Sequence, residues 1–174
     1  MSARLVLMRH AKSDYPWGVE DHDRPLNERG RRDAPEIGAW LDSHLSWSGE
    51  PPRILVSTAL RAQLTWSLAS TRLSARWAGA DVQDEPRIYE AEVGALQDLV
   101  AEQQSADRTL VIVGHNPGLA GLIDRVCIPD DLRARALAKF PTSSVAVLEA
   151  VGPLDAAIRV PGAMRVSAFA VPRG

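Results

Sequence analysis

An arginine and a histidine stand directly after the first apolar run of this 174-residue chain. Residues 5–8 are Leu-Val-Leu-Met, and Arg9 and His10 follow them at once. In open α/β sheets, ligands bind just beyond the carboxyl ends of the strands, so this pair lies where chemistry is usually done. A histidine at the sheet edge beside a solvated arginine is the alternative interpretation of the same residues.

Two further apolar runs are also followed by groups that can do chemistry. Arg61 comes just after residues 53–56, in the first turn of an expected helix, and His115 follows residues 109–113. If the three runs are neighbouring parallel strands, two arginines and two histidines meet in one crevice, together with the amino termini of two helices. Helix amino termini and forked guanidinium donors both suit the oxygens of a phosphoryl group. The pattern therefore predicts a phosphate-binding site that contains a histidine.

The chemistry that uses this set of groups is transfer of a phosphoryl group to an imidazole. A histidine nitrogen attacks phosphorus in line while guanidinium groups stabilise the equatorial oxygens. The imidazole must be neutral, which nearby arginines favour, and its second ring nitrogen must donate to a fixed group such as a backbone carbonyl. A carboxylic acid near the leaving group could supply a proton. Because the arginines neutralise the phosphoryl charge, we expect no divalent ion and no other cofactor.

The elements that position these groups can be predicted from the apolar pattern. Consecutive apolar residues predict buried strands at 4–8, 53–56 and 109–113, and a shorter strand is expected around 81–83. Two last strands are predicted at 143–151 and 164–171, the second alternating apolar and polar residues like an antiparallel edge. The long polar and aromatic loop over residues 11–26 is typical of a binding loop.

Helices are predicted between these strands. Asn27 can cap a helix whose charged residues form its exposed face: Glu28, Arg29, Arg31, Arg32 and Asp33. Ser57 or Thr58 can cap the helix that contains Leu60, Leu64 and Leu68, and residues 93–100 have helical spacing. Asn116 as cap and Pro117 at the first helical position would begin the next helix.

Composition limits the remaining possibilities. The chain is 45% hydrophobic and 24% charged, with a net charge of −2, which is typical of a soluble globular protein with one domain over residues 1–174. We expect neither a nucleic acid nor a membrane as a partner and, without a secretory signal, a cytoplasmic location. Cys127 is the only cysteine, so an internal disulfide is excluded and a buried, inert thiol is expected. The sequence carries no signal for an oligomeric state.

Three sequence blocks resemble the signature of a known family. Met-Arg-His at 8–10, Ser-Thr-Ala-Leu-Arg-Ala at 57–62 and Val-Gly-His-Asn at 113–116 are similar to the blocks of the histidine phosphatase superfamily. Arg-His-Ala-Lys at 9–12, Arg-Pro-Leu-Asn-Glu-Arg-Gly at 24–30 and Gly-His-Asn-Pro at 114–117 most resemble the branch typified by the phosphohistidine phosphatase SixA. The resemblance implies a three-layer α/β/α sandwich of the phosphoglycerate mutase type, and the predicted sheet is mostly parallel with an antiparallel edge.

The resemblance also implies roles for the residues. His10 is the phosphorylated nucleophile, Arg9 and Arg61 bind the phosphoryl group, and His115 contacts the phosphate. By the pattern of the branch, Arg24 is a further phosphate ligand. Lys12 could reach the phosphate or be a solvated loop lysine.

Two glutamates are candidates for the general acid that gives the leaving group a proton. Larger members of the family carry a glutamate in a Glu-x-x-x-Gly segment, and Glu90 with Gly94 fits that spacing. Glu90 is the first candidate and Glu92 the second. For each, a solvated carboxylate favoured by the dipole at a helix start is the alternative interpretation.

These observations predict a metal-independent phosphatase that works through a phosphohistidine intermediate. Short loops favour an open site, and thus a protein phosphohistidine substrate over a small phosphomonoester. A noncatalytic phosphate-binding module is the alternative of another class, but no Gly-x-Gly-x-x-Gly or P-loop motif is present. Among the remaining residues, His22 is expected at the surface, while Tyr15 and Trp17 could form a substrate rim or cover the edge of the core.

Overall fold

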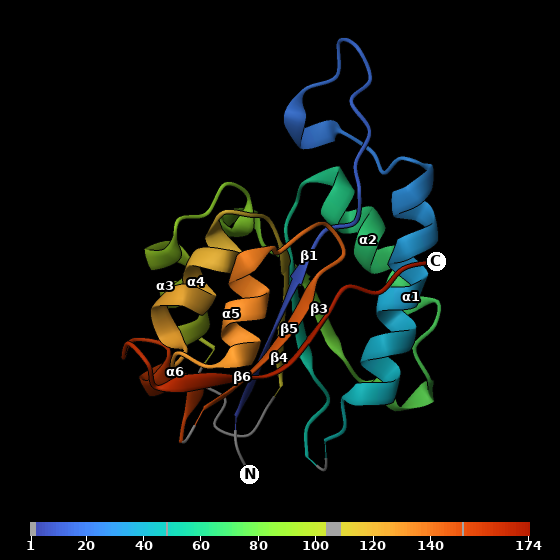
Figure 1. The fold of residues 1–174 in the computed structure, drawn as a ribbon. Helices are drawn as coiled ribbons and strands as arrows, with labels where there is room; N and C mark the ends of the chain where they lie inside the picture. The colour runs from blue at the N-terminus through green and yellow to red at the C-terminus, as the bar shows by residue number, and fades with distance from the viewer. Residues whose placement is uncertain (1–2, 48, 104–108, 151) are drawn as a thin grey trace.

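The protein is built on a six-stranded sheet, described here from a computed structural model that covers residues 3–47, 49–103, 109–150 and 152–174 (Figure 1). The strand order is β3 (Asp81–Asp84), β2 (Arg53–Val56), β4 (Leu110–Gly114), β1 (Arg4–Arg9), β5 (Val145–Ala150) and β6 (Met164–Ala170). The first four strands are parallel, whereas β5 and β6 run antiparallel to their neighbours. The predicted mostly parallel sheet with an antiparallel edge is confirmed; Val151, the predicted end of the fifth strand, lies outside the described residues.

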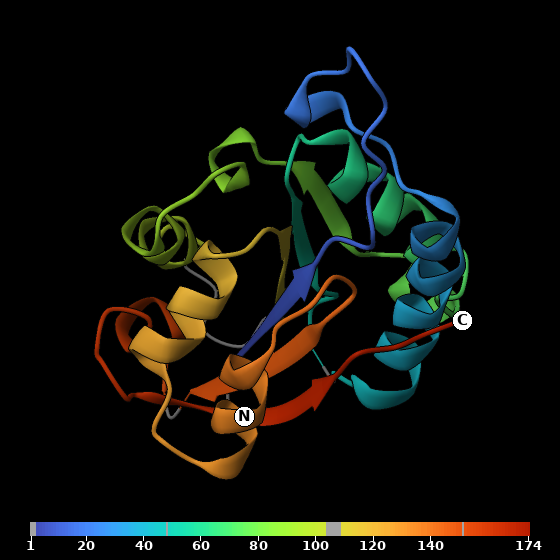
Figure 2. The same cartoon turned by 45° about the horizontal axis from the view of Figure 1, so that its top comes forward.

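Helices cover both faces of the sheet (Figures 1 and 2). One face carries α1 (Glu28–His44) and α2 (Leu60–Ser70); the other carries α3 (Val93–Ala101), α4 (Gly118–Val126), α5 (Asp131–Ala138) and α6 (Leu154–Ala157). Single turns of 3-10 helix occur in the connections at η1 (Asp21–Asp23), η2 (Ala75–Trp77) and η3 (Pro86–Ile88). The predicted three-layer sandwich is therefore confirmed. Helices α5 and α6 were not predicted from the sequence.

The buried central strands explain why their apolar residues are consecutive. Successive side chains of a strand point to opposite faces, so Leu5 and Leu7 join the core beneath α3 and α4. Val6 and Met8 join the other core, beneath α1 and α2. Because helices cover both faces, every position of β1 from 5 to 8 must be apolar.

The start of α1 is fixed by two contacts next to the loop that follows β1. The Asn27 side chain accepts a hydrogen bond from the Gly30 amide at 2.9 Å, as predicted for a cap. A Cβ atom on residue 30 would overlap the carbonyl of Lys12, so only glycine allows this close approach. The first turn of α1 thereby supports the backbone two residues beyond His10.

Asp33 contradicts the predicted exposed face of α1. Its side chain is buried, and it accepts hydrogen bonds from Arg173 at 2.6 Å and from the Gly174 amide at 3.2 Å. The C-terminal residues come back to α1 after β6 (Figure 1), a long-range contact that helical spacing cannot reveal.

The predicted caps of α2 and α4 are wrong. The cap of α2 is Ala59, without a side-chain hydrogen bond, and the Ser57 hydroxyl contacts His115 at 2.8 Å and accepts from the Ala59 amide at 3.3 Å. Helix α4 begins at Gly118, one residue later than predicted, while the Asn116 amide donates to the Phe140 carbonyl at 2.9 Å. Two polar side chains expected to cap helices are therefore engaged beside the sheet edge.

Within the described ranges, no helix is long and apolar enough to cross a membrane. Cys127 is buried at the end of α4 as expected, and burial raises the pKa of its thiol to about 12. A protonated, enclosed thiol of this kind is a poor nucleophile.

Candidate active site

The carboxyl ends of β1, β2 and β4 meet at one edge of the sheet, below the loop of residues 11–27 (Figure 1). His10 follows β1 and His115 follows β4, and their ring centroids lie 5.0 Å apart. Arg61, in the first turn of α2, is 7% exposed and shares a pocket of about 770 Å³ with His115. His10 adjoins this pocket through its contact with His115, and Arg9 is close enough to both histidines to interact with them electrostatically. The structure therefore brings the four predicted residues together.

His10 is held by its backbone and by one ring nitrogen. Its amide donates to the Gly114 carbonyl at 3.0 Å, and its carbonyl accepts from the Ser143 amide at 3.1 Å. Its Nδ1 lies 2.7 Å from the Ala11 carbonyl. Since a carbonyl oxygen only accepts, Nδ1 carries the proton and Nε2 keeps its lone pair. This is the arrangement that attack on phosphorus requires.

Burial and positive surroundings keep His10 uncharged. Removal from water lowers its pKa, and His115, Arg61 and Arg9 lower it further, to about 3 in total. The hydrogen bond to the Ala11 carbonyl acts in the opposite direction and is outweighed. At neutral pH the ring is therefore a neutral imidazole.

His115 presents a free ring nitrogen to the site. Its Nε2 contacts the Ser57 hydroxyl, while burial first and Arg61 second lower its pKa to about 4. In the described part of the chain, His115 Nδ1 and Arg9 Nε are buried polar atoms without a hydrogen-bond partner. An unpaired buried group costs about 1–3 kcal/mol, so such atoms are expected where a ligand supplies the partner. Arg9 is fixed by donation of Nη1 to the Phe140 carbonyl at 2.7 Å.

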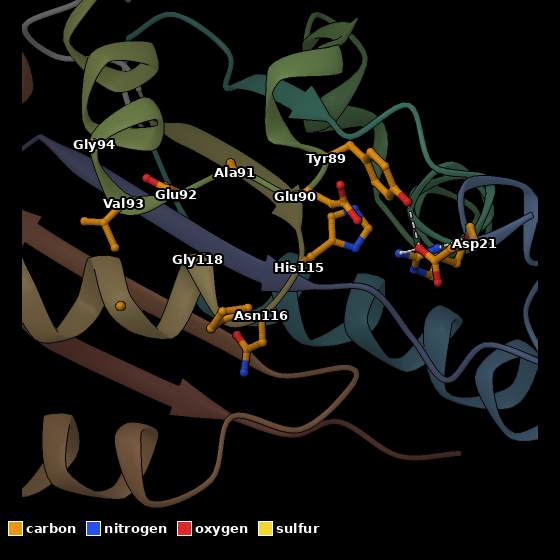
Figure 3. Close-up of a pocket in the computed structure, with 13 residues that line it drawn as sticks. Asp21, Tyr89, Glu90, Ala91, Glu92, Val93, Gly94, His115, Asn116 and Gly118 are labelled. Atoms are coloured by element: carbon orange, nitrogen blue, oxygen red, sulfur yellow. Dashed lines mark hydrogen bonds and ion pairs between the residues drawn. The ribbon is translucent and has the colours of Figure 1, made fainter.

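Asp21 is the central acceptor of the site, and its role was not predicted from the sequence. Its carboxylate accepts hydrogen bonds from Arg61 at 2.9 Å and Arg24 at 2.7 Å. It also accepts one from the Tyr89 hydroxyl at 2.8 Å (Figure 3). Partial burial raises its pKa, but the hydrogen bonds from Tyr89 and Arg24 and the charge of Arg61 outweigh this and lower it to about 2. Asp21 is thus ionised. Its carboxylate is bonded to the guanidinium of Arg61, which was expected to bind phosphate.

Thr65 connects the loop of His10 to the helix of Arg61, another contact that sequence reasoning missed. The buried Thr65 hydroxyl accepts from the Ala11 amide at 2.9 Å and donates to the Arg61 carbonyl at 2.6 Å. The spacing of Thr65 four residues after Arg61 could have indicated the second bond, since threonine often donates to the carbonyl four residues earlier.

Arg24 and Lys12 are not among the residues that line the pocket. Arg24 donates to the Asp14 carbonyl, the Ser13 hydroxyl and Asp21, and its guanidinium carbon lies 3.4 Å from the Tyr15 ring centroid. The Lys12 ammonium lies 5.9 Å from the same centroid. The structure connects Arg24 to the pocket through Asp21 and leaves its predicted role as a phosphate ligand open to test.

Both candidate acids line the pocket, but they lie at different places in it (Figure 3). The Glu90 carboxylate lies on the side of His115, on a backbone with a φ of +54°. The Glu92 side chain lies farther along the pocket, towards Gly94. Glu90 is therefore better placed than Glu92 to reach a leaving group.

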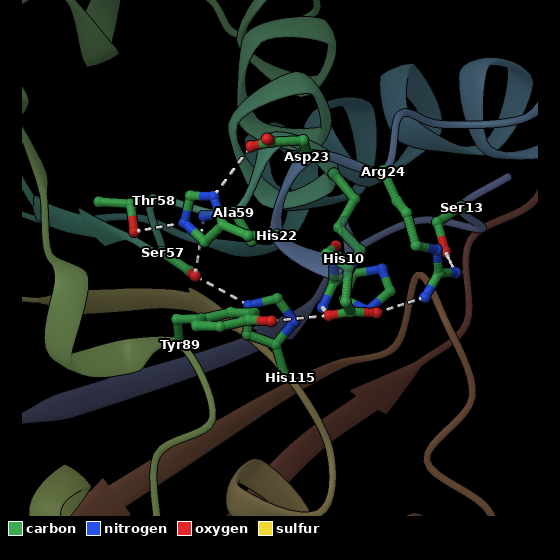
Figure 4. Close-up of polar contacts among 12 residues, drawn as sticks. His10, Ser13, His22, Asp23, Arg24, Ser57, Thr58, Ala59, Tyr89 and His115 are labelled. Atoms are coloured by element: carbon green, nitrogen blue, oxygen red, sulfur yellow. Dashed lines mark hydrogen bonds and ion pairs between the residues drawn. The ribbon is translucent and has the colours of Figure 1, made fainter. Parts of the chain in front are cut away.

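His22 is partly exposed, as expected for a surface residue, and it lies at the rim of the site. Its Nε2 lies 3.0 Å from the Thr58 hydroxyl, and its ring contacts Tyr89 edge-on at 4.9 Å between centroids (Figure 4). Its contact with Thr58, 36 residues later in the chain, explains why local sequence could not place it. Tyr15 stacks on Arg24, whereas Trp17 is fully exposed. Among the described residues, no group of three or more His, Cys, Asp or Glu side chains could hold a metal ion.

Comparisons with known proteins identify the family of the chain. A family model described as the histidine phosphatase superfamily (branch 1) matches residues 5–140. An uncharacterised protein of Mycobacterium tuberculosis is 37% identical over 170 residues, which cover 95% of this chain and 100% of that protein.

Solved structures are similar over almost the whole chain. A putative phosphohistidine phosphatase SixA from Nakamurella multipartitia has a TM-score of 0.81 at 26% identity, covering 99% of this chain and 97% of that one. A second, from Agrobacterium tumefaciens, has a TM-score of 0.76 at 30% identity, covering 97% of each chain. Phosphoglycerate mutase from Plasmodium falciparum shares the fold, with a TM-score of 0.62 at 16% identity and coverage of 99% and 93%. The predicted fold and the resemblance to the SixA branch are confirmed.

Proposed function

The chain belongs to branch 1 of the histidine phosphatase superfamily, and from that membership we propose that it is a phosphatase whose nucleophile is His10. One observation carries the proposal. A buried, neutral imidazole has its Nδ1 proton engaged with the Ala11 carbonyl, and it lies among Arg61, the unpaired Nε of Arg9 and the unpaired Nδ1 of His115.

In the first step, Nε2 of His10 attacks the phosphorus of the substrate. A P–Nε2 bond forms while the bond from phosphorus to the leaving group breaks, and the leaving group takes its electron pair and a proton. Arg9 and Arg61 stabilise the phosphoryl oxygens. Because the Ser57 hydroxyl can donate to Nε2 of His115, Nδ1 of that ring holds a proton to donate to a phosphoryl oxygen.

In the second step, water attacks the phosphorylated imidazole. The new P–O bond forms as the P–Nε2 bond breaks, and the water passes one proton to the Glu90 carboxylate while the other stays on the released phosphate. Neutral His10 and the protonated acid are thereby regenerated. The arginines supply the positive charge, so this route needs no metal ion. The hydrogen bond between Asp21 and Arg61 must break for Arg61 to bind the phosphoryl group. Arg24 donates to Asp21 and positions its carboxylate.

Glu90 is the proposed proton donor for the leaving group. Its place beside His115 supports this role, whereas the pKa of about 2 of Asp21 leaves that residue ionised and unable to donate. A nitrogen leaving group needs less help than an oxygen one. Glu90→Gln should therefore slow the hydrolysis of oxygen esters more than that of phosphohistidine, and equal effects on both would remove Glu90 as the acid.

We favour protein phosphohistidine as the substrate. The pocket holds about 770 Å³, far more than a phosphoryl group occupies, and similar structures are described as putative phosphohistidine phosphatases. A small phosphomonoester is the competing substrate within the same chemistry.

A hydrolysis panel tests the function. A phosphohistidine peptide, a sugar phosphate and an aryl phosphate are compared in excess chelator, with His10→Ala as the inactive control. We expect turnover to persist in chelator, to be fastest for the peptide and to vanish in His10→Ala. Dependence on added magnesium or zinc, or near-normal turnover by His10→Ala, would exclude the proposed mechanism.

A further inference from the structure

The pocket continues well beyond the phosphate-binding residues. Past His115 it runs between the connection from η3 to α3 and the start of α4, in a part that we call the leaving-group groove (Figure 3). The groove is lined by Glu90, Ala91, Glu92, Val93, Gly94, Asn116, Pro117, Gly118 and Gly121. Sites for drug-sized ligands hold about 300–1,000 Å³, so the pocket of about 770 Å³ can hold a substantial part of the substrate.

The polar side chains of the groove are acceptors. Glu90 and Glu92 are two exposed carboxylates, and Asn116 Oδ1 is buried without a partner because its amide nitrogen donates to the Phe140 carbonyl. Among the described residues that line the pocket, Arg61 is the only lysine or arginine, and it belongs to the phosphate-binding end. Beside the groove, His115 is 9% exposed and its Nδ1 also has no partner.

Helix amino termini do not reverse this charge. The start of α3 at Val93 carries the positive end of a helix dipole, equivalent to about half an elementary charge. The Glu92 carboxylate carries a full negative charge, and Glu90 adds a second one except while it holds the proton for the leaving group, so the groove remains negative. An additional phosphate or carboxylate on the substrate would be repelled here.

We propose that the leaving-group groove selects a polypeptide in which a lysine or arginine lies close to the phosphorylated side chain. The inference rests on the proposed phosphatase function and names its substrate class. Ala91, Val93 and Pro117 contact the aliphatic stem of the basic side chain, while its charged end approaches Glu92 and a donor of the substrate binds Asn116 Oδ1. Substrates with several anionic groups, such as bisphosphates, are disfavoured.

Charge selectivity is tested with three phosphohistidine peptides that differ at one flanking position, which is lysine, glutamine or glutamate. We expect kcat/KM to rank lysine above glutamine above glutamate, with about three- to tenfold between neighbours at low salt, because exposed charge pairs are weak and screened. Glu92→Gln should narrow the differences in kcat/KM between the three peptides, with each value divided by that of the same variant on phosphoramidate, a minimal P–N substrate. Asp98→Asn, an exposed carboxylate of α3 outside the pocket, is the matched control.

Binding of the peptide in the leaving-group groove is tested with a variant whose larger side chain fills part of the groove. A Cβ atom at Gly94 meets nothing within 4 Å, so Gly94→Leu adds a side chain to open space in the first turn of α3. We expect this variant to lose at least about tenfold in kcat/KM for the lysine peptide and to keep its activity on phosphoramidate. Gly49→Leu, at an equally open glycine outside the pocket, should leave both activities unchanged.

The outcomes separate the two proposals. If phosphoramidate and all three peptides resist the wild-type enzyme, the phosphatase function itself fails. If the wild-type enzyme hydrolyses all three peptides at equal rates, or if Gly94→Leu leaves the lysine peptide unaffected, the function stands and the groove proposal is overturned.

Discussion

At the scale of single residues, His10 is made reactive by removal from water and not by a partner base. Its Nδ1 is bonded to a backbone carbonyl, and its other neighbours, Arg9, Arg61 and His115, all oppose a positive charge on the ring. The same surroundings that bind a phosphoryl anion therefore keep the nucleophile neutral.

This environment makes folding sensitive to acid. The pKa of His10 is about 3 in the folded chain and about 6.5 in an unfolded one, so between these values the unfolded chain binds the extra proton. As the pH drops from about 6.5 towards 3, His10 should lower the unfolding free energy by about 1.4 kcal/mol per pH unit. Urea unfolding at about pH 7 and about pH 5 should show a smaller loss for His10→Gln than for wild type. An equal loss would contradict the burial account.

Asp21 should compete with phosphate for Arg61. Asp21→Asn removes a negative charge 2.9 Å from the guanidinium, so inorganic phosphate should inhibit this variant at about three- to tenfold lower concentration. The inhibition constant measures this directly. Asp23→Asn, which removes a neighbouring exposed carboxylate bonded to His22, is the control. Weaker phosphate inhibition of Asp21→Asn would instead show that the carboxylate mainly positions Arg61.

The position of a site residue could be predicted from the sequence where that residue lies at the end of a strand or directly follows it. Arg9, His10 and His115 are placed by β1 and β4, whose ends are evident from their apolar runs. Asp21 and Tyr89 are 68 positions apart in the chain and meet through loops. Nothing local predicts that contact.

At the scale of elements, the site depends on how α2 and the loop after β1 are joined. Thr65 makes that connection through one hydroxyl, which is bonded to the Ala11 amide and the Arg61 carbonyl. Helix α2 is therefore joined to the loop after β1 by a buried hydrogen-bonded hydroxyl, where an apolar contact would be usual.

Thr65→Val should weaken both stability and catalysis. It leaves the buried Ala11 amide unpaired, which costs about 1–3 kcal/mol of unfolding free energy. Because small displacements of catalytic groups can reduce rates up to about a hundredfold, kcat should fall about tenfold or more. Thr71→Val removes a more exposed hydroxyl at the end of α2 and should change neither the unfolding free energy nor kcat. Unchanged kcat in Thr65→Val would show that the link is dispensable.

The predicted strands and longer helices match the structure, and the failures have local causes. Helix α5 buries only Ala136 of its eight residues, and α6 has four residues, so neither gives a clear apolar stripe. The caps predicted at Ser57 and Asn116 failed because those side chains contact other strands and loops at the site.

At the scale of the whole molecule, the C-terminal residues tie the antiparallel edge to α1. After β6 the chain crosses to α1 (Figure 1), where Arg173 and the Gly174 amide donate to Asp33. Asp33 lies one turn after Gly30, whose contact with Lys12 supports the loop of His10.

Asp33→Asn should loosen this connection. The substitution removes the buried charge that Arg173 neutralises and disturbs two hydrogen bonds, so we expect a loss of about 1–3 kcal/mol of unfolding free energy. Urea unfolding measures it, with Asp124→Asn, at an exposed ion pair with Arg133, as the control. A stability equal to wild type would mean that the C-terminal contact contributes nothing to the fold.

The role of His10 as nucleophile is tested most directly by trapping the phosphorylated enzyme. The protein is mixed with labelled substrate, quenched in alkali within one turnover and digested, and the modified peptide is identified by mass spectrometry. We predict one acid-labile, alkali-stable phosphoryl group on His10 and none in His10→Ala. Label on another residue, or undiminished hydrolysis by His10→Ala, would show that His10 is not the nucleophile.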